Sequence, residues 1–243
     1  MPIRFYNTLT RREEEFVPLV DGRAGVYVCG PTVYATPHIG NLRTFFFSDT
    51  VRRYLEFRGY RVKFVMNLTD VDDKTIRGAL REGVKLGEYT QPFVDSLFRD
   101  FDRLGIRRAD AHPRATDYVP QMVEIIGRLE ERGSAYPADD GSVYYSIAKF
   151  ADYGKLSKVD LSAARRGERV ASDEYEKEDV RDFVLWKGVK PEDEQVGAVW
   201  DTPWGRGRPG WHIECSAMAM DELGETFDIH AGGVDLVFPH HED

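Results

Sequence analysis

The sequence predicts an α/β fold in which a parallel sheet is interrupted by an inserted region. An apolar run rich in β-branched and aromatic residues at 25–29 indicates a buried strand, and a second strand is expected over 61–67. A helical pattern lies between them. Strand, helix and strand in this order indicate a right-handed parallel βαβ unit. From about Ala135 the chain becomes polar and rich in charge, which indicates an insertion.

The helix between the two apolar runs is expected over 41–58. Gly59 closes it, as a C-terminal glycine often does. One face of this helix carries apolar residues at positions i, i+4, i+7 and i+8, namely Phe47, Val51, Tyr54 and Leu55.

Two further helices are expected over 89–104 and 117–132, the second ending before Gly133. The turn 139–141 then predicts a hairpin between 135–136 and 143–147. Residues 149–195 are charge-rich, with one apolar segment at 183–186, and are interpreted as insertion rather than core. From Trp204 glycine, aromatic and histidine residues become dense again.

Composition narrows the class of protein. The net charge is −9, whereas a domain that binds nucleic acid by itself usually carries a basic excess. Two arginine clusters, within 103–108 and 165–169, are therefore interpreted as solvated surface. There is no apolar run of about 18 residues and no signal peptide pattern, so no membrane partner and a cytoplasmic location are expected. The two cysteines, Cys29 and Cys215, are not expected to form a disulfide there.

The turn 37–43 lies between the first strand and the first helix. The first turn of a helix has free backbone N–H groups that attract phosphate, and Gly40 would let a ligand approach the backbone closely. His38 and Asn41 lie one turn apart and could face the same anion. The alternative is a loop histidine before an ordinary helix cap, and the residues themselves leave both open.

Four of the six histidines and one of the two cysteines lie between 212 and 241. A thiolate together with imidazoles suits zinc, although the spacing does not specify ligands and packing histidines remain an alternative. A second cluster, Asp70, Asp72 and Asp73, could hold magnesium. The interpretation favoured for these three carboxylates is that they cap a strand end and begin a helix.

Seven segments, in order along the chain, resemble the family of cysteinyl-tRNA synthetases. They are 6–10 (YNTLT), 27–34 (YVCGPTVY), 38–41 (HIGN), 67–74 (NLTDVDDK), 207–216 (GRPGWHIECS), 227–236 (FDIHAGGVDL) and 238–242 (FPHHE). The resemblance implies a class I synthetase with a Rossmann-type catalytic domain split by a connective insertion. Residues 1–134 would form the first half of that domain, 135–203 the insertion and 204–243 the start of the second half.

The resemblance also implies site residues. The family's zinc ligands correspond to Cys29, Cys215 and His240, and a glutamate ligand would follow Asp243. Zinc would favour the thiol of cysteine over the hydroxyl of serine, which a merely apolar pocket separates poorly. The pocket for L-cysteine would consist of Cys29, Thr69, Trp211, His230 and Asp235, in which the aspartate pairs with the substrate ammonium.

The family's HIGH motif falls on residues 38–41, with asparagine in the fourth position. Asn41 can still donate a hydrogen bond but carries no proton charge. His38 and Asn41 are the predicted catalytic residues, and together with Gly40 they would bind ATP and its Mg²⁺. The implied reaction forms cysteinyl-adenylate and then transfers cysteine to tRNA(Cys). The main tRNA contacts are expected beyond residue 243, and the chain is expected to be a monomer.

The segment 155–158 (KLSK) looks like the family's second phosphate-binding motif, KMSKS, but precedes Cys215 and is interpreted as an ordinary part of the insertion. The true loop is expected after residue 243. We therefore expect a fragment of a longer protein that charges tRNA poorly by itself. Two alternatives remain: a ligase of the mycothiol type that passes cysteine to a small amine, and a non-catalytic module that binds zinc or cysteine.

Overall fold

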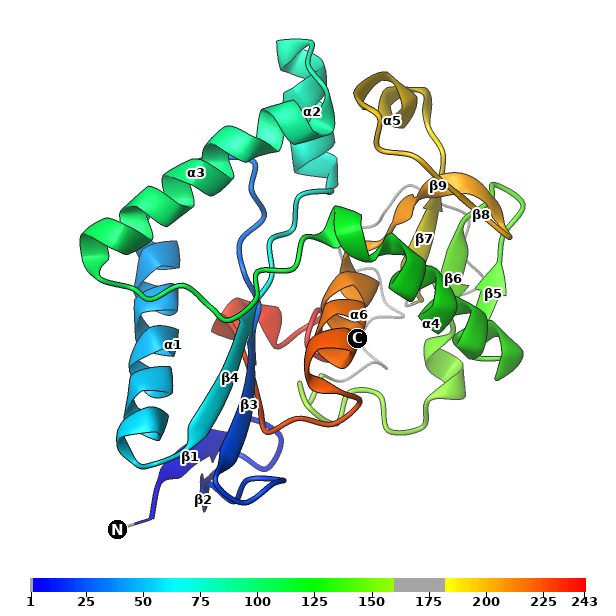
Figure 1. The fold of residues 1–243 in the computed structure, drawn as a ribbon. Helices are drawn as coiled ribbons and strands as arrows, with labels where there is room; N and C mark the ends of the chain where they lie inside the picture. The colour runs from blue at the N-terminus through cyan, green and yellow to red at the C-terminus, as the bar shows by residue number, and fades with distance from the viewer. Residues whose placement is uncertain (1, 160–181) are drawn as a thin grey trace.

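A computed structural model describes residues 2–159 and 182–243 of the chain (Figure 1). Its strands are β1 Arg4–Asn7, β2 Arg12–Glu15, β3 Arg23–Val28, β4 Arg61–Met66, β5 Ala135–Pro137, β6 Val143–Tyr145, β7 Phe183–Gly188, β8 Trp200–Thr202, β9 Gly205–Pro209 and β10 Ile229–Ala231. Its α-helices are α1 Ile39–Phe57, α2 Asp73–Glu82, α3 Leu86–Leu104, α4 Val119–Glu131, α5 Pro191–Val196 and α6 Trp211–Leu223. Short 3-10 turns are η1 Ala115–Tyr118, η2 Ile147–Lys149 and η4 Val234–Leu236.

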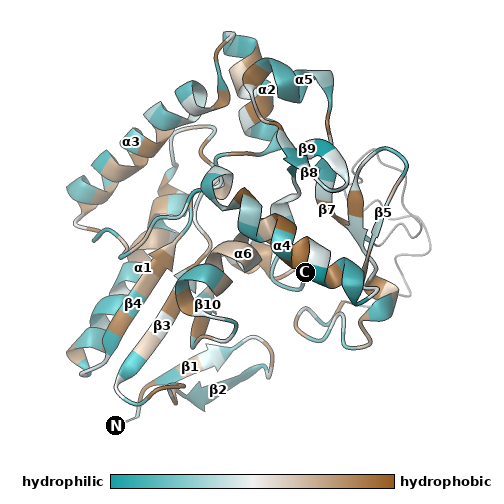
Figure 2. Cartoon of the chain, turned by 45° about the vertical axis from the view of Figure 1, so that its right-hand side comes forward, coloured by the Kyte–Doolittle hydropathy of each residue, from teal (hydrophilic) through white to brown (hydrophobic). Residues whose placement is uncertain are grey.

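A parallel sheet in the order β10-β3-β4 forms one half of the molecule. Val26 of β3 lies opposite Phe64 of β4 and Ile229 of β10, and both pairings are parallel. Helix α1 connects β3 to β4 and covers one face of the sheet (Figure 1). The α/β fold and the parallel strand-helix-strand unit predicted from the sequence are therefore confirmed. Figure 2 shows the apolar residues concentrated along β3 and β4, beneath α1.

The apolar face predicted for α1 is partly wrong. Phe47 and Tyr54 are 67% and 46% exposed, while Leu55 is buried. The buried side of α1 also contains Asp49 and Arg52, which the sequence pattern does not identify as core. The Arg52 guanidinium bonds Asp110 Oδ1 at 3.0 Å, and Asp49 Oδ2 bonds Arg53 Nε at 2.8 Å. Paired charges can be buried because their partners replace water, so the buried face does not follow hydropathy alone.

A five-stranded antiparallel sheet in the order β5-β6-β7-β9-β8 forms the other half. The segment 183–186, interpreted from the sequence as insertion rather than core, lies in its central strand β7. Leu185 and Trp186 are buried in one apolar cluster with Tyr27 of β3 and Met218 of α6. The interpretation that 183–186 lies outside the core was therefore wrong. Residues 184–188 are buried in the sheet although a polar stretch precedes them in the sequence. The predicted insertion boundaries, 135 and 203, stay a prediction, although β9 pairs with β7 beyond residue 203.

Helix α6 lies between the two sheets (Figure 1) and contacts β3, β4, β7 and α4. It begins directly after β9, and Gly210 permits this close junction. A Cβ built on Gly210 would lie 2.1 Å from the Val184 carbonyl oxygen. Any residue other than glycine would therefore clash with β7 at this position. The first turn of α6 is therefore fixed against β7, which determines where Cys215 lies.

An ion-pair network joins α2 to the antiparallel sheet. Asp73 accepts from Lys187 of β7 at 3.0 Å and from Arg208 of β9, and Arg208 Nε also bonds Asp193 of α5 at 3.0 Å. Lys187 and Arg208 are buried. Burial alone would raise the pKa of Asp73, but Arg208 and Lys187 outweigh it and lower the pKa to about 2. The network ties the segment after β4 to the sheet that carries α6.

Replacing Asp73 by asparagine is expected to lower the free energy of unfolding by about 2 kcal/mol, less than the ~3–5 expected for a fully buried pair, because 39% of the Asp73 side chain is exposed. Since the pKa is lowered from 3.8 to about 2, the stabilisation is present above about pH 4 and is lost as the pH falls toward 2. Urea unfolding at pH 7 and below pH 4 measures both effects.

The matched control is Glu194→Gln, which removes the exposed ion pair of Glu194 with Arg206 at 2.6 Å and is expected to cost under about 0.5 kcal/mol. Equal losses of unfolding free energy in Asp73→Asn and Glu194→Gln would contradict the stabilising role of this network. So would a stability difference between Asp73→Asn and wild type that grows as the pH falls.

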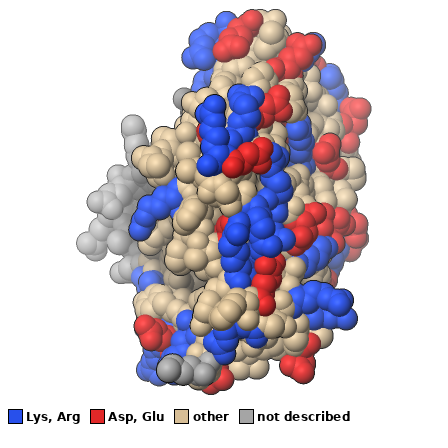
Figure 3. All heavy atoms as spheres, turned by 60° about the vertical axis from the view of Figure 1, so that its left-hand side comes forward, with Lys and Arg blue, Asp and Glu red and all other residues tan. Residues whose placement is uncertain are grey.

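Among the described residues, no helix combines the length and apolarity needed to cross a membrane. Figure 3 shows basic side chains interspersed with acidic ones on the face that it presents. The predicted arginine cluster at 103–108 lies on the surface and is paired there. Arg107 bonds Glu56 at 2.5 Å and Arg108 bonds Asp102 at 2.9 Å. The second predicted cluster, 165–169, lies outside the described residues.

Candidate metal centre and active site

The functional side chains gather where β3 and β10 end. Cys29 directly follows β3, and its N–H donates to the Ala231 carbonyl of β10 at 2.9 Å. His230 lies in β10, opposite Tyr27. Cys215 comes from the second turn of α6, which packs against β3. Because parallel strands place their carboxyl ends at one edge, residues about 200 positions apart meet there.

The loop after Cys29 is fixed by Asn67, which follows β4. The Gly30 N–H donates to Asn67 Oδ1 at 2.8 Å, and Asn67 Nδ2 donates to Thr69 Oγ1 at 3.2 Å. A Cβ on Gly30 would lie 1.7 Å from the Asn67 carbonyl oxygen, so a glycine is required at this position. The Cys215 Sγ lies 3.9 Å from the same Oδ1. Asn67 thus connects Cys29, Cys215 and Thr69.

Cys29, Cys215 and His240 form a buried group whose possible ligand atoms all lie within 4.8 Å of one another. The two sulfurs are 3.8 Å apart, and His240 Nε2 lies 3.3 Å from Cys215 Sγ. On a tetrahedral zinc, two sulfur ligands stand about 3.8 Å apart, and a sulfur and an imidazole nitrogen about 3.6 Å apart. The spacing of these three residues therefore fits zinc.

Stacking holds the imidazole of His240 in this orientation. Its ring lies on the Trp211 indole with centroids 4.2 Å apart and an interplanar angle of 5°. Only 6% of His240 is exposed. Trp211 begins α6, four residues before Cys215, so one helix carries both a candidate ligand and the surface that orients another.

The two thiols of this group lie in hydrogen-bond contact, 3.8 Å apart. The bond with Cys29, helped by His240, outweighs burial and lowers the pKa of Cys215 to about 5. The same bond, together with burial, raises the pKa of Cys29. The lowered pKa of Cys215 favours its thiolate, which is the form that binds metals.

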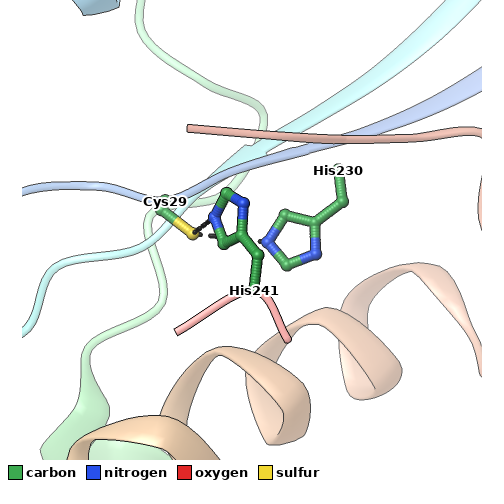
Figure 4. A group of neighbouring side chains, drawn as sticks. All are labelled: Cys29, His230 and His241. Atoms are coloured by element: carbon green, nitrogen blue, oxygen red, sulfur yellow. Dashed lines mark hydrogen bonds between the residues drawn. The ribbon is translucent and has the colours of Figure 1, made fainter. Parts of the chain in front are cut away.

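A second group contains Cys29, His230 and His241, and Figure 4 shows both imidazoles directed at the Cys29 sulfur. The distances from Cys29 Sγ are 3.3 Å to His230 Nε2 and 3.2 Å to His241 Nε2. Although His230 is an exposed residue, desolvation of its imidazole, followed by the effect of the neighbouring His241, lowers its pKa to about 3. Desolvation, followed by the effect of His240, lowers the pKa of His241 to about 4. Both imidazoles are therefore neutral at pH 7.

The remaining predicted pocket residues lie around these groups. Thr69 is 2% exposed, and its hydroxyl contacts Asn67 and the buried Glu214. Asp235 is exposed and close enough to His241 to raise its pKa. The structure thus brings Cys29, Cys215, His240, Trp211 and His230 together, with Thr69 and Asp235 at the margins. Their assignment as substrate or metal residues stays a prediction.

His38 and Asn41 lie at the exposed start of α1, and their hydrogen bonds are with this helix start. His38 Nδ1 accepts from the Gly40 N–H at 3.0 Å, and Asn41 Oδ1 accepts from the His38 N–H at 3.2 Å. The two side chains therefore form the helix cap that was the alternative interpretation. His38 Nε2 and Asn41 Nδ2 take no part in the cap, so the cap leaves both available to a ligand.

The three aspartates after β4 have separate partners. Asp72 caps α2 by accepting from the Lys74 N–H at 2.8 Å, as the favoured interpretation expected. Asp70 accepts from Thr116 Oγ1 at 2.7 Å, and Asp73 belongs to the ion-pair network. These carboxylates serve structural contacts rather than one shared cation.

Sequence reasoning did not single out three residues at this site. His241 was counted among the clustered histidines but not placed beside Cys29. Asn67 and Glu214 lay inside quoted motifs without a role. Glu214 is fully buried beside Thr69, and burial raises its pKa well above the usual value. The available signal was proximity in the sequence, because Glu214 and His241 adjoin Cys215 and His240, and Asn67 lies two residues before Thr69.

The chain resembles known proteins in sequence and in fold. A family model described as tRNA synthetases class I (C) catalytic domain matches residues 15–243. A protein named Cysteine--tRNA ligase from Chlamydia pneumoniae is 53% identical over 98% of this chain and 50% of its own length. One of the same name from Methanosarcina mazei is 52% identical over 99% of this chain and 51% of its own. The chain thus spans about half the length of these relatives.

Among solved structures, Mycobacterium tuberculosis methionyl-tRNA synthetase in complex with methionyl-adenylate is similar in fold. The TM-score is 0.62 at 14% sequence identity, over 88% of this chain and 52% of that one. A second structure of that synthetase, bound by methionyl-adenylate, gives a TM-score of 0.63. At this identity the likeness concerns the fold alone. The family match over residues 15–243 and the two ligase relatives lead to one conclusion: the chain belongs to the family of tRNA synthetases class I (C) catalytic domains.

Proposed function

We propose that this chain carries the amino-acid activation site of a cysteine--tRNA ligase, which joins L-cysteine to tRNA(Cys) at the expense of ATP. The observation that supports it best is the buried group of two thiols and one imidazole, with 3.8 Å between the sulfurs, at the carboxyl edge of the parallel sheet. Relatives named for this activity over the whole of the chain support the same function.

In this proposal Cys29, Cys215 and His240 hold Zn²⁺. When bound, zinc supplies a Lewis acid that stabilises a thiolate and binds a hydroxyl far less well. The chain's own residues would complete the selection. Neutral His230 would lie beside the substrate sulfur without adding a charge, and Trp211 would close the side-chain pocket.

The remaining roles concern the two ends of the substrate. The carboxylate of Asp235 would pair with the ammonium of cysteine, and the buried Thr69 would line the pocket. At the start of α1, His38 Nε2 and Asn41 Nδ2 would bind the ATP phosphates with their Mg²⁺, and Gly40 would let the phosphates approach the backbone closely. These groups would position the α-phosphate for attack by the cysteine carboxylate and stabilise the charge that develops.

The proposal also includes the tRNA contacts, the cellular location and the oligomeric state. The tRNA 3′ end would receive cysteine at this edge of the sheet, while the main tRNA contacts would come from the half of the relatives that this chain does not match. A cytoplasmic location and a monomeric state belong to the same proposal. Two buried thiols without a disulfide fit a reducing compartment.

Exchange of labelled pyrophosphate into ATP tests the proposal. It is expected to depend on L-cysteine, with L-serine at least about 100-fold less effective. The assay is best run on the zinc-loaded chain and on a longer version of it. The longer version also contains the region that corresponds to the half of the relatives that this chain does not match. Zinc binding without cysteine-dependent exchange in the longer version would contradict the proposal and indicate a non-catalytic module.

A further inference from the structure

The turn Tyr153–Ser157 holds the segment that contains His240. Three backbone N–H groups of this turn converge on the Glu242 carboxylate. Gly154 N–H donates to Oε1 at 2.9 Å, Leu156 N–H to Oε1 at 3.4 Å, and Ser157 N–H to Oε2 at 2.6 Å. Backbone N–H groups that converge on one anion bind it strongly and in a defined orientation.

The Asp243 carboxylate is contacted by two side chains, one from the turn and one from α6. The Tyr153 hydroxyl donates to Asp243 Oδ1, and His212 Nδ1 lies 3.0 Å from Asp243 Oδ2. Only 1% of the Asp243 side chain is exposed. Because His212 belongs to the first turn of α6, Asp243 connects the turn to the helix that carries Cys215.

These contacts matter for His240 because it lies outside the regular elements. β10 ends at Ala231 and η4 at Leu236, so neither a strand nor a helix fixes the position of His240. The local backbone bonds are short-range, such as Glu242 N–H to the Pro239 carbonyl at 2.9 Å. The contacts at Glu242 and Asp243 tie this short segment to the rest of the fold.

We propose that the turn Tyr153–Ser157 is a positioning element for the metal centre, because it orients His240 toward Cys215 through Glu242 and Asp243. The inference rests on the proposed metal role of His240. It also gives the segment 155–158, which resembles a phosphate-binding loop, a different task. The backbone of this segment binds a carboxylate of the chain itself, and the Lys155 side chain is 60% exposed beside Asp152.

Cobalt(II) binding to the purified chain tests this role, with chelator competition for affinity and the visible spectrum for ligand geometry. Glu242→Ala is expected to weaken Co²⁺ binding by about 10- to 100-fold, the usual effect of losing a residue that supports a ligand. Its spectrum should move toward that of His240→Ala. Tyr153→Phe, which removes one hydroxyl, is expected to shift both readouts in the same direction by a smaller amount.

Two comparisons make the test decisive. Glu242→Gln keeps one acceptor oxygen for the Gly154 and Leu156 N–H groups and should retain part of the affinity, whereas a direct metal ligand would lose as much as Glu242→Ala. Lys155→Ala, on the same turn, should bind like wild type. Wild-type affinity and spectrum in Glu242→Ala, or equal losses in Glu242→Gln and Glu242→Ala, would overturn the inference. Failure of the wild-type chain to bind Co²⁺ would instead overturn the proposed metal centre.

Discussion

Replacing Cys215 by serine is expected to lower the affinity of the chain for zinc by more than about 100-fold, because the loss of a residue that only supports a ligand already costs 10- to 100-fold. The hydrogen bond with Cys29 and the neighbouring His240 lower the pKa of Cys215, which favours the thiolate, whereas a serine hydroxyl stays protonated at pH 7. Zinc content after dialysis and chelator competition measure the effect, which should appear equally in Cys29→Ser.

The control for this prediction is Ser216→Ala, the next residue on α6, which is outside the Cys–His group. It should retain one zinc per chain. Thermal unfolding of the zinc-free proteins should show that Cys215→Ser still folds, since serine is slightly smaller than cysteine. If Cys215→Ser still bound one zinc tightly, the zinc site would lie elsewhere in the chain.

Replacing His38 by asparagine is expected to slow cysteine-dependent pyrophosphate exchange by about 100-fold or more, the usual effect of removing one donor to a developing negative charge. Asparagine is among the best helix-capping residues, so this variant keeps the cap that His38 Nδ1 now provides. It removes the second imidazole nitrogen, Nε2, which takes no part in the cap. The turnover rate and the specificity constant should fall together, as for an interaction made in the transition state.

His38→Ala separates the two roles of His38. It should lose about 1 kcal/mol of stability through the lost cap, and its exchange rate should fall as far as that of His38→Asn. Unchanged exchange in His38→Asn would mean that His38 serves α1 alone. The assay uses the version of the protein in which wild-type exchange is measurable.

Much of the fold followed from local pattern. The segment around Val26 is a short apolar run, and a buried parallel strand has that pattern because both of its faces are covered. Around Phe64 only the second half of the strand, 64–66, is buried. α1 was found but its buried face was not, since Asp49 and Arg52 are buried through ion pairs. Arg52 pairs with Asp110 and Asp49 with Arg107, each across 58 positions of the chain, which periodicity does not reveal.

The candidate site shows the same division. Clustered histidines and two cysteines indicated a metal, but spacing left the ligands open, because Cys29, Cys215 and His240 come from three separate segments of the chain. The ligand set came from family resemblance. His241 was not placed, because only the fold brings its ring to Cys29. The role of the turn Tyr153–Ser157 was equally hidden, since backbone N–H groups bind Glu242 and every sequence provides such groups.

In the proposed function, the zinc held by Cys29, Cys215 and His240 selects the substrate by binding its sulfur. The visible spectrum of the cobalt-substituted chain, recorded while L-cysteine or L-serine is added, tests it most directly. The account predicts that L-cysteine strengthens the sulfur-to-cobalt charge-transfer band and shifts the cobalt bands, whereas L-serine at the same concentration leaves both unchanged. Identical responses to the two amino acids, or no response to L-cysteine in a chain that binds one cobalt, would contradict it.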